Sequence, residues 1–395
     1  MASLAFLLGM IPGTEKVESA DDQLRADFKA YRDYEKSDEL KHFLELEKEV
    51  TSADFAIRKK KIKGENYKSS EEYRKEARYK QLLKKSKGEE PSGDIKKLEE
   101  EIDSDAFQKR KSYLLMKPRA RYETTDEYLK EQEYQELKKS EKVMWYFKTK
   151  KKYPFREIEK WEETFNESFA GNKLDTSRWM TRYFWGDAIL NEPYTLADDK
   201  SFPTDGKNIE FYDTKMRLVT KREEVEGKKW NPMHGFLQDS FDFTSALVST
   251  GISFRQKFGI FKAKIKLSST DLTQAFWMVS DNMLPHIDVV KYEKGKLFAN
   301  YFWGSGKESA PARSISKTKG TKFSNEFFIF TLEWSPGKLV WKINEKVFKT
   351  QTSDVPQEEM YMVFSAGLKE WASDQGLPAA MEIDWIRVYK LKEKD

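Results

Sequence analysis

The stretch Met381-Glu382-Ile383-Asp384-Trp385-Ile386-Arg387-Val388-Tyr389, near the end of the chain, alternates apolar and charged side chains along most of its length. Alternation with a period of two is typical of a β-strand that lies with one face on a hydrophobic core. Similar stretches occur after Phe165, at residues 209–211, 216–219, 258–265 and 338–343, and turn-forming residues separate them. Because no helices alternate with them, we predict an antiparallel β-sandwich over residues 160–392.

The composition of the chain changes near residue 155. Residues 1–150 contain 34 Lys and Arg and 32 Asp and Glu, whereas nine of the eleven tryptophans lie from Trp179 onward. In the first part, apolar residues recur at steps of three and four, which is the period of an amphipathic helix. We therefore predict a multidomain α plus all-β protein, with an apolar segment at residues 1–20 and charged helices at residues 21–155.

The helical region contains an internal repeat, with copies at about residues 40–90 and 93–142. Two patterns return, with shifts of 52 and 55 residues: Leu46-x3-Val50-x-Ser52-x2-Phe55-x2-Arg58-Lys59 as Leu98-x3-Ile102-x-Ser104-x2-Phe107-x2-Arg110-Lys111, and Ser69-x2-Glu72-Tyr73 as Thr124-x2-Glu127-Tyr128. Ser69 with Glu72, and Thr124 with Glu127, have the capping-box spacing of a helix start. Two such helices cannot bury their apolar stripe alone, so we expect the copies to stack and to form a stalk or adaptor for protein partners.

Charge and cysteine usage exclude several classes of function. The 71 basic and 67 acidic residues give a net charge of only +4, which argues against a nucleic-acid partner. The absence of cysteine excludes disulfides, thiolate metal sites and a lipoprotein anchor. The apolar run Leu4-Ala5-Phe6-Leu7-Leu8 is too short to span a bilayer, and no basic residue precedes it as in a signal peptide.

Five ordered stretches of the second half resemble glycoside hydrolase family 16, the laminarinase, agarase and lichenase group. They are Phe169-Ala170-Gly171-x2-Leu174-Asp175-x3-Trp179, the strand Phe258-Gly259-x2-Lys262-Ala263-Lys264-Ile265-Lys266-Leu267, Ala275-Phe276-Trp277-Met278, Thr331-Leu332-Glu333-Trp334-Ser335-Pro336, and the closing stretch quoted above. The resemblance covers about residues 160–392. It implies a concanavalin-like jelly roll with a glycan cleft along one sheet.

The strand that carries catalysis in this family is altered. Family members have Glu-x-Asp-x-x-Glu there, where the first Glu is the nucleophile, the Asp tunes it and the last Glu protonates the leaving oxygen. This chain has His286-Ile287-Asp288-Val289-Val290-Lys291, so the resemblance places His286 and Lys291 at the two glutamate positions. It also implies a bulge before position 291, which returns that side chain to the cleft face of positions 286 and 288. Neither side chain restores a carboxylate pair, although Glu293 is two positions further along. No catalytic residue is expected.

Three roles remain open for His286, Asp288 and Lys291: a hydrogen-bonded remnant that fills the cleft floor, retained glycan binding, or new acid–base chemistry. Further glycan-binding candidates are the tryptophans Trp185, Trp303 and Trp371, whose flat faces suit pyranose rings, together with Glu293. We expect Trp277 and Trp385 to be structural, because they lie within strands.

Metal binding is not expected. The three histidines, His42, His234 and His286, lack the spacing of a metal site. Some relatives hold a structural calcium with the Asp of the closing strand, which Asp384 matches. The opening Phe165-Asn166-Glu167-Ser168-Phe169, however, departs from the usual acidic pair. No cofactor is required.

The sequence therefore favours a non-catalytic protein in which a glycosidase-like β-sandwich binds a polysaccharide and is carried on helical repeats. One alternative is a structural component of a virion or surface assembly that makes protein contacts only. A homo-oligomer is left open under either function. A second alternative is an atypical glycoside hydrolase that acts on a β-linked polysaccharide. An extracellular surface or a particle is favoured over the cytoplasm.

Overall fold

The computed structural model describes residues 11–86, 92–304 and 310–393. The chain divides into two compact units, which we call the helical unit and the β unit. The helical unit comprises Leu24–Phe155, and the β unit comprises Met1–Gln23 with Arg156–Asp395. Residues 11–23 therefore group with the β-sandwich rather than with a separate apolar segment. The apolar run at residues 4–8 lies outside the described residues.

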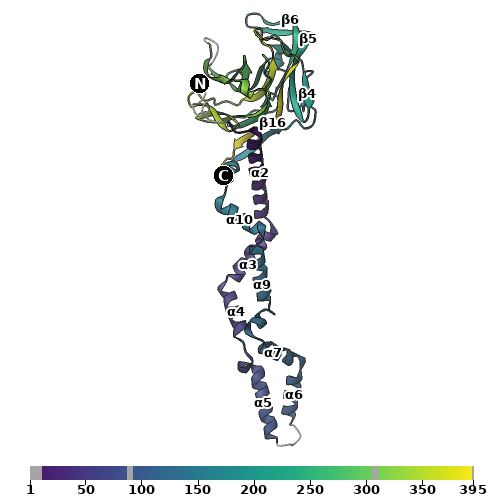
Figure 1. Ribbon diagram of the computed structural model, residues 1–395, viewed down its shortest axis with the longest axis vertical. Helices are drawn as coiled ribbons and strands as arrows, with labels where there is room; N and C mark the ends of the chain where they lie inside the picture. Colours follow the sequence, from purple (N-terminus) through teal and green to yellow (C-terminus); the bar gives the residue numbers. More distant parts are fainter. Residues whose placement is uncertain (1–10, 87–91, 305–309, 394–395) are drawn as a thin grey trace. The chain divides into compact units, whose positions relative to one another are not determined.

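In the helical unit, the chain runs through one series of short helices and then returns beside it through a second series (Figure 1). Its elements are α2 (Thr14–Glu35, shared with the β unit), α3 (Asp38–Val50), α4 (Ala53–Gly64), η1 (Tyr67–Ser69), α5 (Glu71–Lys85), α6 (Gly93–Asp103), α7 (Asp105–Leu115), α8 (Pro118–Tyr122), α9 (Asp126–Lys138) and α10 (Glu141–Lys152).

Serine side chains start most of these helices. The hydroxyls of Ser37, Ser52, Ser70, Ser104 and Ser140 each accept a hydrogen bond from the backbone N–H three residues later. This bond satisfies one of the unpaired amides of a helix start, so each serine begins the helix that follows it. The capping positions predicted at Ser69 and Thr124 are each one residue too early: the N-caps are Ser70 and Thr125, and Thr125 makes no side-chain cap bond.

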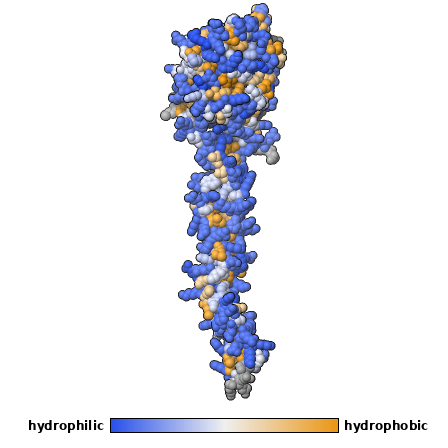
Figure 2. Space-filling model, turned by 90° about the vertical axis from the view of Figure 1, so that its right-hand side faces the viewer, coloured by the Kyte–Doolittle hydropathy of each residue, from blue (hydrophilic) through white to orange (hydrophobic). Residues whose placement is uncertain are grey.

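The two repeats exchange halves instead of closing on themselves. The first two helices of the first copy, α3 and α4, contact α9 and α8 of the second copy, while α5 of the first copy contacts α6 and α7 of the second. Equivalent contacts mark both junctions. Lys59 lies over the ring of Tyr122 and is paired with Glu131, and Lys111 lies over the ring of Tyr67 and is paired with Glu76. On the face shown in Figure 2, hydrophobic residues of this unit form small separate spots in a hydrophilic surface.

The β unit is a sandwich of two antiparallel sheets. Sheet I has the order β4-β5-β16-β7-β12-β13-β14, with β1 on β16, and sheet II has the order β11-β10-β9-β8-β15-β6. The long strands β5 and β6 pair with each other and join the two sheets. The strands are β1 (Trp161–Glu167), β2 (Tyr194–Thr195), β3 (Phe202–Pro203), β4 (Ile209–Tyr212), β5 (Lys215–Asn231), β6 (Gly235–Ser249), β7 (Gly259–Lys266), β8 (Thr273–Val279), β9 (His286–Glu293), β10 (Lys296–Trp303), β11 (Ala312–Lys319), β12 (Phe327–Ser335), β13 (Lys338–Ile343), β14 (Lys346–Gln351), β15 (Tyr361–Gly367) and β16 (Ala379–Leu391). Short helices α11 (Arg156–Glu159), α12 (Phe184–Leu190) and η2 (Thr321–Phe323) complete the unit.

The hydrophobic core lies between the two sheets and confirms the predicted sandwich. Phe261 and Ile265 of sheet I and Phe276 and Met278 of sheet II are fully buried in it. On β16, the pairing register with β7 shifts between Ile383 and Trp385, so Asp384 is an extra residue. This bulge explains why the alternation breaks at Trp385-Ile386: the shift lets Ile386 join the core while Trp385 lies outside that cluster.

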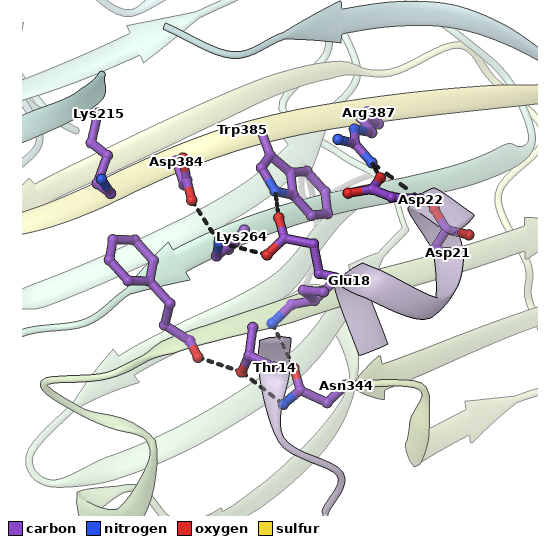
Figure 3. Close-up of polar contacts among 12 residues, drawn as sticks. Thr14, Glu18, Asp21, Asp22, Lys215, Lys264, Asn344, Asp384, Trp385 and Arg387 are labelled. Carbon is purple, nitrogen blue, oxygen red and sulfur yellow. Dashed lines mark hydrogen bonds and ion pairs between the residues drawn. The ribbon is translucent and has the colours of Figure 1, made fainter. Parts of the chain in front are cut away.

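The first turns of α2 dock on the face of sheet I that points away from the core (Figure 3). Glu18 accepts a hydrogen bond from Nε1 of Trp385 at 2.7 Å and pairs with Nζ of Lys264 at 2.7 Å. Nζ of Lys264 is also 2.7 Å from Oδ2 of Asp384, and Arg387 pairs with Asp22 at 3.1 Å. We call this set the α2 clasp. It explains why residues 14–23 belong to the β unit although more than 130 residues separate them from β1.

Candidate functional site: a cavity on sheet II

Strand β9 carries the three residues that the family resemblance places at catalytic positions. Phe276 of β8 pairs with Val290 and Trp277 pairs with Asp288, so Val289 is an extra residue on β9. This bulge returns Lys291 to the face that His286 and Asp288 occupy, and all three side chains line one cavity. The predicted bulge and the shared face are both present.

The cavity has a volume of about 360 Å³ and lies on the face of sheet II that points away from the core, which we call the site face. That volume is within the range of small-molecule sites. Its floor comes from β6, β8, β9, β10 and β15, and further walls come from the segments around Tyr183, Leu196–Pro203 and Met283–Leu284. Apolar walls with a few converging polar groups are typical of ligand sites.

Asp288 is the centre of the polar network in the cavity. Its Oδ1 lies 2.9 Å from Nε2 of His286, its Oδ2 accepts a hydrogen bond from Nδ2 of Asn300 at 2.7 Å, and its backbone oxygen accepts one from Nε1 of Trp341 at 2.9 Å. Burial by itself raises the pKa of Asp288, but His286, Lys291 and Asn300 outweigh this effect, and the pKa lies below its ordinary value. Asp288 is therefore an ionised acceptor with both oxygens in use.

Lys291 is paired as well. Its Nζ lies 3.0 Å from a carboxylate oxygen of Glu293, and about a quarter of each of the two side chains is exposed. Glu293 thus lies beside the cavity on the same side as Lys291, as expected from its position two residues further along the strand.

A second carboxylate in the cavity comes from a part of the chain that the sequence did not indicate. Asp199 lies just before β3, pairs with Nζ of Lys369 at 2.7 Å and accepts a hydrogen bond from the backbone N–H of Leu196 at 2.8 Å. Burial raises the pKa of Asp199 above its ordinary value, although Lys369 acts in the opposite direction. The cavity thus contains two carboxyl groups whose pKa values are shifted in opposite directions.

Comparison with known proteins agrees with this architecture. Residues 198–387 match the sequence profile of the glycosyl hydrolases family 16. The matched segment is just under half of the chain and lies within the β unit. Among curated proteins, none matches the sequence of the chain.

Several solved structures are similar to part of the chain. An endo-acting O-glycanase described from members of the human gut microbiota is 18% identical, with a TM-score of 0.49 over 59% of this chain and 92% of that one. The laminarinase catalytic domain of Thermotoga maritima MSB8 is 19% identical, with a TM-score of 0.48 over 59% and 99%. The kappa-carrageenase of Pseudoalteromonas carrageenovora is 18% identical, with a TM-score of 0.47 over 58% and 94%.

Three tryptophans of the β unit lie elsewhere than the sequence suggested. Trp277, expected to be structural, lines the cavity: its ring stacks on His286 with centroids 4.8 Å apart, and its Nε1 donates to Ser365 at 3.1 Å. Trp303 packs on the core side of β10 against Tyr301, and Trp185 packs against Tyr194, Trp230 and Phe236. Neither of these two tryptophans lines the cavity. On β10, strand alternation turns Phe302 rather than Trp303 toward it.

Trp371 lies in the loop before β16 and is 40% exposed. Nζ of Lys294, from the turn between β9 and β10, lies 4.2 Å from its ring centroid. The ring therefore stands beside the β9–β10 turn and is not part of the cavity wall.

The residues that some family 16 relatives use for calcium do not fit a metal ion in this chain. Asp384 is ion-paired with Lys264, whose ammonium also binds Glu18 (Figure 3). In the opening strand, Glu167 accepts hydrogen bonds from two backbone N–H groups and pairs with Arg178. A lysine ammonium thus occupies the space beside Asp384 where a cation would bind. Within residues 11–86, 92–304 and 310–393, no group of three or more acidic or histidine side chains is arranged to hold a metal.

Among the helices of these same segments, none is long and apolar enough to cross a membrane.

Proposed function

We propose that the β unit is a non-catalytic, glycan-binding member of the glycosyl hydrolases family 16, and that the cavity on sheet II is its binding site. The observation that carries this proposal is the convergence of His286, Asp288 and Lys291 on one cavity in which they supply only one carboxylate. Retaining hydrolysis in this family needs two carboxyl groups about 5–5.5 Å apart, one as nucleophile and one as acid. The imidazole and ammonium at the two glutamate positions provide neither.

The same groups suit hydrogen bonding to sugar hydroxyls. Asp288 accepts, Lys291 donates, and His286 can do either, while the rings of Trp277 and Phe302 provide apolar surface for the carbon faces of a sugar. A glycan-binding role also agrees with a position at an extracellular surface or on a particle, where polysaccharides are present.

Binding and turnover are tested on the full chain with laminarin, lichenan, agarose, xyloglucan and carrageenan. We expect at least one polymer to bind without release of reducing ends, and His286→Ala and Lys291→Ala to weaken that binding about tenfold each. Lys262→Ala, on the outer face of sheet I, is the matched control and should bind normally.

Two results would overturn the proposal. Absence of binding to every glycan would favour a domain that makes protein contacts only. Hydrolysis that disappears in Asp288→Asn or Asp199→Asn would show instead that the two carboxyl groups of the cavity form an unusual catalytic pair.

A further inference from the structure

The site face of sheet II continues beyond the cavity onto its edge strand. β10 pairs with β9 on one side and with β11 on the other, and side chains at paired positions lie on the same face. Four rows therefore cross the three strands: His286–Phe302–Arg313, Asp288–Asn300–Ile315, Lys291–Phe298–Lys317 and Glu293–Lys296–Lys319. Because Asp288 faces the cavity, the residues of β11 in these rows share its face.

Three of the four outer ends of these rows are basic and exposed. Arg313, Lys317 and Lys319 on β11 and Lys296 on β10 are exposed, and the part of the chain that the structure describes gives none of them a carboxylate partner. In contrast, Lys291, Lys369 and His286 in the cavity are all paired. We call Lys296, Arg313, Lys317 and Lys319 the basic edge.

The opposite half of the site face is covered. Leu247, Tyr361 and Val363, on β6 and β15, are each about 1% exposed, because Tyr183 and Phe184 pack over them. A ligand that extends from the cavity across the strands, away from these covered residues, passes over β10 and β11. There it meets the partly exposed rings of Phe298 and Phe302 between the basic side chains.

We infer that the β unit binds an acidic glycan, with a sugar unit in the cavity and carboxylate or sulfate groups on the basic edge. The inference rests on the proposed function and specifies the class of its ligand. Unpaired exposed cations attract anions at little desolvation cost, and arginine and lysine are suited to carboxylate and sulfate oxygens. The carboxylates of Asp288, Asp199 and Glu293 in and beside the cavity disfavour a ligand with a charge on every unit, such as a nucleic acid, but accept hydroxyl hydrogen bonds.

Matched polymer pairs test the inference on the full chain. Partially sulfated dextran is compared with dextran, and partially methyl-esterified polygalacturonate with the fully esterified polymer, so that only the acidic groups differ and uncharged units remain for the cavity. We expect the acidic member of at least one pair to bind ten or more times tighter at low salt, with an affinity that falls as salt rises. Arg313→Gln with Lys317→Gln should lower this affinity about tenfold and reduce its salt dependence, whereas Lys338→Gln with Lys346→Gln, on β13 and β14 of sheet I, should not.

Each other outcome would contradict the inference in a different way. Equal binding of neutral and acidic polymers would leave glycan binding in place and remove the preference for acid. Tighter binding of a single-stranded oligonucleotide than of any glycan would assign the basic edge to nucleic acid. If the Arg313→Gln, Lys317→Gln variant binds normally but aggregates, the charges serve only to prevent pairing of an exposed edge strand.

Discussion

Nζ of Lys59, in the first repeat of the helical unit, lies 2.6 and 2.7 Å from the two carboxylate oxygens of Glu131 in the second repeat. The equivalent lysine of the second repeat, Lys111, pairs with Glu76 of the first. Each repeat thus provides the lysine for one junction and the glutamate for the other. The two copies therefore depend on each other, and neither forms a closed structure alone.

Charge reversal at one junction tests this exchange. Lys59→Glu places two carboxylates next to each other and should lower the free energy of unfolding of the helical unit by about 1–2 kcal/mol, because the pair is only partly exposed. Adding Glu131→Lys should restore at least half of the loss, as a double-mutant cycle followed by circular dichroism would show. Lys60→Glu, at an exposed neighbouring position, is the control and should have little effect.

Adding Glu76→Lys to Lys59→Glu, which would pair residues of the same repeat, should restore nothing. Recovery in that combination would contradict the exchange of halves.

Removal of calcium should not affect the β unit, because Lys264 supplies the positive charge beside Asp384. We expect the same melting temperature in EDTA and in calcium chloride. Lys264→Met should lower the free energy of unfolding by about 2 kcal/mol, since Glu18 and Asp384 would then lie partly buried without a shared cation. Lys262→Met is the matched control on the same strand, because Lys262 pairs with one carboxylate of the described residues, Glu345, and its loss should be smaller. A large drop in melting temperature in EDTA would contradict this account.

The buried Lys349 makes stability depend on pH in the alkaline range. Burial lowers the pKa of Lys349 to about 8, although Asp288 acts in the opposite direction. The unfolded lysine titrates near pH 10.4. Between these two values the unfolded chain binds more protons, so the free energy of unfolding should rise with pH by at most about 1.4 kcal/mol per unit.

The measurement is urea unfolding at pH 7 to 10.5 for the protein and for Lys349→Met. The rise should be absent in the variant, whose absolute stability also changes because Ala299 and Ser314 lose the donor to their backbone oxygens. An identical slope in both proteins would exclude Lys349 as its cause.

The double change His286→Glu with Lys291→Glu should restore hydrolysis. The bulge on β9 already directs positions 286, 288 and 291 into one cavity. A glutamate at position 291 would lie beside Glu293, and this like charge raises the pKa of the new acid, as a proton donor requires. We expect release of reducing ends from laminarin, lichenan or agarose by the double variant, and none by either single variant, because both carboxyl groups are needed. Activity in a single variant would contradict this reading of β9.

The sequence allowed the β-sandwich and the shared face of His286, Asp288 and Lys291 to be predicted, because alternation and a one-residue insertion determine which way a side chain points. It did not allow Trp277 to be placed. Both faces of β8 are buried, so its sequence does not alternate between apolar and polar residues and does not show which side chains point toward the cavity. Asp199 was missed because it lies in an irregular segment that long-range pairing with Lys369 holds in position. Arg121, which is buried and donates to the backbone oxygens of Ile62 and Met116, likewise depends on contacts that no local pattern reveals.

The α2 clasp has a consequence for synthesis of the chain. Glu18 and its partner Trp385 are 367 residues apart, so at ordinary translation speeds Glu18 emerges roughly 20 to 70 s before β16 exists. The helical unit, which lies between them in the sequence, is complete on the ribosome long before its N-terminal flank has a strand to bind. Closure of the clasp is therefore a late event in the folding of the nascent chain, and it signals that the final strand of the sandwich is in place.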